Sequence, residues 1–139
     1  MDTGENKKIV ELWLKDLSAS LGVELSLDDE GLCSFQADEE RIITIEVPPE
    51  LSQVYLYTPL VPLPNEDPER SNNLMTKALE LNAFQIASGG ASIALVPGMA
   101  LFVLCYENAI EGVDSERFNH ILGLFLETAT DIKKALARC

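Results

Sequence analysis

The sequence predicts a single α+β domain of 139 residues, with three helices and a mostly antiparallel, curved sheet of about five strands (α-β-β-β-α-β-β-α). Two observations support this prediction. Apolar residues recur with the period of a helix near the start, in the middle and at the end of the chain, and with the period of a strand in between. The apolar fraction of 47% is enough for one core at this length.

The first helix is predicted from Lys7 to Leu21, because apolar residues form one stripe along it. The stripe consists of Val10, Trp13, Leu14, Leu17 and Leu21. Ile9 and Leu12 fall outside the stripe, so a second apolar face of this helix requires a second partner. Gly22 follows as a C-terminal cap.

Three short runs after this helix alternate apolar and polar residues, as strands do. They cover residues 23–27, 32–35 and 41–47. The third run has three apolar residues on one face: Ile43, Ile45 and Val47. We therefore expect this face to be buried.

A fourth run, residues 53–57, leads into a proline-rich connection from Tyr57 to Asp67. Proline cannot donate a backbone hydrogen bond to a neighbouring strand. Pro59, Pro62 and Pro64 therefore exclude a central strand here and favour an extended edge or a loop.

In the second half, Asp67-Pro68 opens a helix, and Pro97-Gly98 forms a turn between two strands. The second of these strands, Met99 to Tyr106, is apolar at nearly every position, so we expect both its faces to be covered. The last helix is capped near Asp114-Ser115. Its stripe is Phe118, Ile121, Leu122, Phe125, Ala129, Ile132 and Leu136.

The chain carries 23 acidic and 10 basic residues, a formal charge of −13. A field of this sign repels phosphate backbones and anionic lipids, so we expect no nucleic acid and no membrane as partner. It suits a protein that holds other polypeptides, and equally it suits ordinary solubility. The three cysteines form no C-x-x-C pair, and the N-terminus lacks the features of a signal peptide. We therefore expect a cytoplasmic protein.

No set of residues predicts catalysis, a cofactor or a metal site. His120 is the only histidine, and the cysteines are too few for a zinc site. Gly90–Ala94 is similar to a nucleophile elbow around Ser92, but a helix and loop precede this serine where the motif needs a strand. We expect no enzyme.

Three stretches, Leu79–Phe84, Gly89–Leu95 and Leu101–Leu104, together resemble the class I type III secretion chaperones, the Tir chaperone family. Members of that family have a helix that ends in Asn and an apolar residue, then a glycine-containing loop, a strand of small residues and a second apolar strand. The order and length of the predicted elements match along the whole chain. The connection from Tyr57 to Asp67 looks longer than the family's usual link.

The resemblance implies a cytoplasmic bacterial homodimer that holds the N-terminal segment of a secreted effector protein in extended form, with the secretion apparatus as a further possible partner. In such chaperones the second helix and the late strands make the dimer contact, which maps to Leu74, Met75, Leu79, Leu101 and Val103. The first helix and early strands contact the effector, which maps to Leu12, Leu25, Leu27, Phe35, Ile43 and Ile45.

The expected mechanism is coupled folding and binding, in which an extended segment adds to a sheet edge and places apolar side chains on the chaperone. Three alternatives remain. The chain could sequester a regulatory factor, it could be a structural subunit that only self-assembles, or it could be a small enzyme that uses Ser92 and His120. The identity of the bound protein separates the sequestering role from the chaperone, whereas a structural subunit would bind no foreign protein.

Overall fold

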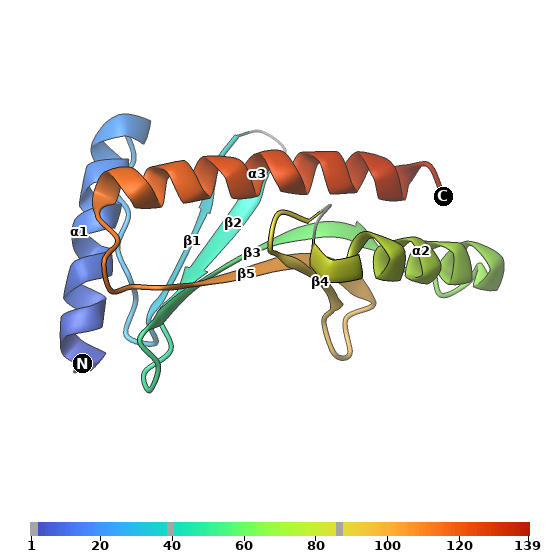
Figure 1. The fold of residues 1–139 in the computed structure, drawn as a ribbon, viewed down its shortest axis with the longest axis horizontal. Helices are drawn as coiled ribbons and strands as arrows, with labels where there is room; N and C mark the ends of the chain where they lie inside the picture. The colour runs from blue at the N-terminus through green and yellow to red at the C-terminus, as the bar shows by residue number, and fades with distance from the viewer. Residues whose placement is uncertain (1–2, 39–40, 86–87) are drawn as a thin grey trace. The chain divides into compact units, whose positions relative to one another are not determined.

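The computed structural model describes residues 3–38, 41–85 and 88–139. It confirms three helices and a five-stranded antiparallel sheet in the predicted order (Figure 1). The elements are α1 (Thr3–Leu21), β1 (Leu32–Gln36), β2 (Ile42–Glu46), β3 (Gln53–Pro62), α2 (Pro68–Leu81), a 3-10 turn η1 (Ala83–Gln85), β4 (Ser92–Leu95), β5 (Leu101–Ala109) and α3 (Ser115–Ala137).

The strand order in the sheet is β1-β2-β3-β5-β4, so β1 and β4 are its edge strands. The chain divides into two compact units. The N-terminal unit comprises Met1–Leu56 and Glu107–Gly123, and the C-terminal unit comprises Tyr57–Tyr106 and Leu124–Cys139. Each unit has its own buried apolar residues.

In the N-terminal unit, α1 buries the predicted stripe through Leu17, whereas Leu21 at its end is exposed. Trp13 stacks on Phe118 of α3, with ring centroids 4.9 Å apart and an interplanar angle of 22°. The predicted face of β2 is confirmed, because Ile43, Ile45 and Val47 are fully buried. The sequence therefore identified the core of this unit.

In the C-terminal unit, α2 begins as predicted. The Asp67 carboxylate accepts a hydrogen bond from the Arg70 N–H at 3.1 Å, and Pro68 occupies the first turn. The turn before β5 is also confirmed, since Met99 N–H donates to the Val96 carbonyl at 3.1 Å and Gly98 has φ +78°. The predicted stripe of α3 is buried in both units: Phe118, Ile121 and Leu122 belong to the N-terminal unit, and Phe125, Ala129, Ile132 and Leu136 belong to the C-terminal unit.

The prediction of a strand at residues 23–27 is wrong. This segment pairs with no strand, and side chains of α1 bind its backbone amides instead. Leu25 N–H donates to Ser18 Oγ at 2.9 Å, and Leu27 N–H donates to Glu11 Oε1 at 2.8 Å. Apolar and polar side chains do alternate along this segment, but helix α1, rather than a neighbouring strand, supplies its hydrogen-bond partners.

The prediction that prolines exclude a central strand after residue 57 is also wrong. β3 runs without interruption to Pro62 and is the middle strand of the sheet. Thr58 and Leu60 are buried on either side of the exposed Pro59, so the period of two continues through the proline. Each proline removes only its own donor, and beyond the strand Leu63 N–H still donates to the Ala100 carbonyl at 2.7 Å.

Candidate binding surfaces

One exposed apolar side chain of α1 lies outside its buried stripe. Leu12 is 62% exposed, whereas Val10 and Leu14 on either side of it in the sequence are fully buried. Val23, in the segment that follows α1, and Ile42 on β2 are each about half exposed in the same unit. The N-terminal unit therefore presents apolar side chains from a helix, a loop and a strand.

The backbone of β1 is partly available at the edge of the sheet. Gly31 and Ala37 direct their backbone groups towards the β2 side, since Val47 N–H donates to the Gly31 carbonyl and Ala37 N–H donates to the Arg41 carbonyl. Because direction alternates along a strand, the backbone groups of Leu32 and Ser34 face away from β2.

Asp28 already binds the outward backbone groups of Leu32. Its carboxylate accepts from Leu32 N–H at 3.0 Å, and its own N–H donates to the Leu32 carbonyl at 2.8 Å. An added strand could therefore not pair with β1 at Leu32, and the next outward backbone groups are those of Ser34.

The sequence-predicted effector residues divide by burial. Leu12 is exposed, and Leu27 and Phe35 are half-buried. Leu25, Ile43 and Ile45 are buried within the chain itself, so their side chains belong to the core as the structure stands. The first three can touch a partner without rearrangement.

In the C-terminal unit, apolar side chains are exposed along α2, η1 and the strands that follow. Phe84 is 93% exposed, Leu79 71% and Met99 64%, and Leu95 is also exposed. Phe84 and Gln85 both have φ +56°, in the left-handed region that side chains rarely adopt. The Phe84 side chain is therefore available to contact another polypeptide.

The sequence-predicted dimer residues also divide by burial. Leu79 is exposed, Met75 and Leu101 are half-buried, and Leu74 and Val103 are buried. Sequence reasoning missed Phe84 and Met99 as surface residues. The one feature of the sequence that indicated their exposure was their position in short connections beside turn-forming residues.

The electrostatics of the N-terminal unit come mainly from carboxylates at the surface. The pKa of the exposed Tyr55 hydroxyl is raised, first because it donates a hydrogen bond to the Glu107 carboxylate. Burial raises the pKa of the Cys33 thiol.

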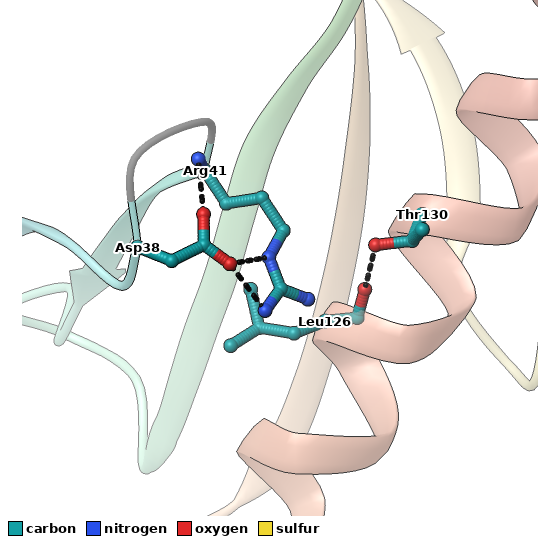
Figure 2. A network of polar contacts seen from close by, with 4 residues as sticks. All are labelled: Asp38, Arg41, Leu126 and Thr130. Atoms are coloured by element: carbon teal, nitrogen blue, oxygen red, sulfur yellow. Dashed lines mark hydrogen bonds and ion pairs between the residues drawn. The ribbon is translucent and has the colours of Figure 1, made fainter.

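Figure 2 shows Arg41 and Asp38 as an ion pair, with Arg41 Nε 2.6 Å from Asp38 Oδ2. It also shows a separate hydrogen bond within α3, in which the Thr130 hydroxyl donates to the Leu126 carbonyl.

The two residues considered for catalysis lie on different elements. Ser92 lies on β4 and its Oγ is 2.8 Å from Gln85 Nε2, while His120 is exposed on α3. Among the residues that the structure describes, no three His, Cys, Asp or Glu side chains converge as metal ligands. No helix within 3–38, 41–85 and 88–139 is long and apolar enough to cross a membrane.

These surfaces define a class of protein: a small α+β domain with exposed apolar side chains, an edge strand and an acidic surface, which suits the binding of other polypeptides. The family is identified by the sequence. Residues 13–133 match the Tir chaperone protein (CesT) family, and the chain belongs to this family.

Solved structures share the fold. The chain aligns with the ExsC–ExsE complex at a TM-score of 0.73 and 21% identity, covering 98% of this chain and 97% of that one. It aligns with the HopA1–SchA chaperone–effector complex at a TM-score of 0.70 and 19% identity, covering 94% of this chain and 96% of that one. It aligns with the heterodimeric complex ExoU–SpcU from the type III secretion system of Pseudomonas aeruginosa at a TM-score of 0.65 and 15% identity. This alignment covers 91% of this chain and 93% of that one. A search of curated protein sequences gives no match.

Proposed function

We propose that this chain is a cytoplasmic chaperone that binds the N-terminal segment of a type III secretion effector and keeps it soluble and competent for secretion. The observation that supports this most is the family match over residues 13–133. Similar structures include a chaperone–effector complex and a complex from a type III secretion system. The proposed function needs no enzymatic step, nucleotide or metal.

In the proposed mechanism the effector segment binds in extended form to the N-terminal unit. Its backbone pairs with the edge of β1 at Ser34, and its apolar side chains contact Leu12, Leu27 and Phe35. The segment loses conformational entropy on binding, so a long contact is needed for tight binding. Binding would hold the segment unfolded without any change in its covalent structure.

We further propose that the C-terminal unit forms a homodimer. Its formal charge is −1, from 6 acidic and 5 basic residues, so two copies meet without strong repulsion. Leu79, Phe84 and Met99 are the exposed apolar side chains that a second copy would cover. A two-fold dimer would present two effector surfaces to one long segment.

Light scattering after size exclusion tests the dimer with two matched variants. Leu79→Asp adds a charge to the C-terminal unit, and we expect it to be monomeric. Leu12→Asp makes the same change on the N-terminal unit, and we expect it to stay dimeric. A monomeric wild-type chain, or an equal effect of both variants, would contradict the proposed dimer surface.

Capture of the tagged chain from its own cells tests the chaperone function. Bound proteins are digested mildly before elution, and the protected fragments are sequenced. We expect the N-terminal segment of a larger secreted protein. Recovery of a regulatory factor instead would favour the sequestering role, and recovery of the chain alone under secretion-inducing growth would contradict both.

A further inference from the structure

The negative charge of the chain is concentrated in one of its two units. The N-terminal unit has 17 acidic and 5 basic residues, a formal charge of −12, whereas the C-terminal unit has −1. Both units expose apolar side chains, so ordinary solubility does not explain why only one of them is acidic.

Within the N-terminal unit the excess of acidic residues lies around the edge strand β1. In α1 three acidic residues are matched by three lysines. Between residues 22 and 56 there are nine acidic residues and a single base, Arg41, which is already paired with Asp38. Glu24, Asp29 and Glu30 are exposed in the connection before β1, and among the described residues none of their carboxylates forms an ion pair. One cation lies close, because Lys7 Nζ of α1 donates to the Asp29 backbone carbonyl at 3.2 Å.

This acidic stretch lies next to the features that would bind a polypeptide. It leads directly into β1, where the backbone groups of Ser34 face away from β2. Val23 and Ile42, both about half exposed, lie within the same stretch. An extended segment bound here would gain Coulomb energy from Lys or Arg side chains, and an acidic segment would be repelled.

We propose, on the basis of the proposed chaperone function, that the N-terminal unit selects a cationic client segment, in which Lys or Arg residues alternate with apolar ones. The alternation follows from strand geometry, since successive side chains of a paired strand point to opposite faces. The acidic connection supplies selectivity and a fast association rate, and the apolar side chains supply most of the affinity.

Fluorescence anisotropy with three labelled synthetic peptides tests this proposal on the full-length chain. The peptides share their length and their Leu and Val positions, and they carry Lys, Gln or Glu at the positions between. We expect the Lys peptide to bind best at about 0.05 M NaCl and to lose about ten-fold in affinity at about 0.5 M. Absence of binding by the Lys peptide, or equal binding of all three, would overturn the proposal.

Two matched variants separate a local site from the general attraction of an acidic protein. The N-terminal triple variant is Glu24→Gln, Asp29→Asn and Glu30→Gln. The C-terminal triple variant is Glu66→Gln, Glu69→Gln and Glu80→Gln, which removes the same charge from exposed positions. We expect about a five- to ten-fold loss of Lys-peptide affinity in the first and less than two-fold in the second. Equal losses would overturn the local site.

A captured client distinguishes failure of this inference from failure of the chaperone function. If the client binds the wild-type chain and the N-terminal triple variant equally, at low and high salt, the cationic preference is wrong and the chaperone function stands. If no client binds the wild-type chain, the function itself fails. Circular dichroism of each variant checks that the fold is unchanged.

Discussion

The side-chain amide of Asn82 makes two hydrogen bonds with the backbone of Ile93. Its Nδ2 donates to the Ile93 carbonyl at 3.0 Å, and its Oδ1 accepts from the Ile93 N–H at 2.8 Å. Asn82 is the C-terminal cap of α2, and Ile93 is a buried residue of the edge strand β4. One side chain thus replaces a neighbouring strand and ties the end of the helix to the sheet.

Replacement of Asn82 by Ala should destabilise the chain, because both backbone groups of Ile93 lose their partner. We expect a loss of about 1–3 kcal/mol in urea unfolding. Asn73→Ala is the matched control, since Asn73 is exposed on the same helix. We expect it to be neutral or slightly stabilising. Fast hydrogen exchange of the Ile93 amide in wild type would contradict this account.

Gly31 cannot be replaced without strain. It has φ +82°, and a Cβ at this position would lie 2.5 Å from the Val47 carbonyl oxygen. We expect Gly31→Ala to cost about 2–4 kcal/mol, from the left-handed backbone and the displaced carbonyl together. Gly22→Ala is the control, because Gly22 also has positive φ but open space around it. We expect it to cost about 1 kcal/mol.

Relief of backbone strain at Phe84 should stabilise the monomer. Phe84→Gly, made in the Leu79→Asp background so that dimerisation does not interfere, should gain about 0.5–1 kcal/mol in chemical unfolding. Ala83→Gly, at the neighbouring residue without positive φ, should instead lose stability. A loss at both positions would show that the Phe84 side chain contributes to folding.

The stability of the chain should fall at alkaline pH through the thiols of the buried Cys33 and the half-buried Cys105. Burial raises the pKa of Cys33 and of Cys105, so the folded state keeps their protons where the unfolded state loses them. The resulting stability is complete below the ordinary thiol pKa of about 8.5 and declines as the pH rises through the folded values. In urea unfolding with reductant, wild type should lose more stability between about pH 7 and pH 9.5 than Cys33→Ala/Cys105→Ala. An equal loss would contradict the assignment.

The sequence predicted elements well where burial alone determines the pattern. The stripes of α1 and α3 and the face of β2 were predicted because a core requires one apolar face. Alternation does not show what lies beside a segment, which is why residues 23–27 were misread as a strand. Their amides bind Ser18 and Glu11, and no periodicity predicts a hydrogen bond from a helix side chain.

The candidate surfaces were predicted less completely for a related reason. Leu12 was found because it falls outside a buried stripe. Ile43 and Ile45 carry the same signal as any core residue, and only the structure shows that they are buried. Phe84 was missed because exposure of a loop residue depends on tertiary contacts rather than on a local pattern.

The most direct test of the chaperone account uses a captured client divided into its N-terminal segment and the remaining polypeptide. Each part is mixed with the purified chain and weighed by native mass spectrometry. We predict a complex of two copies of the chain with one N-terminal segment, and no complex with the remainder. A complex with the remainder alone, or with neither part, would contradict the central claim.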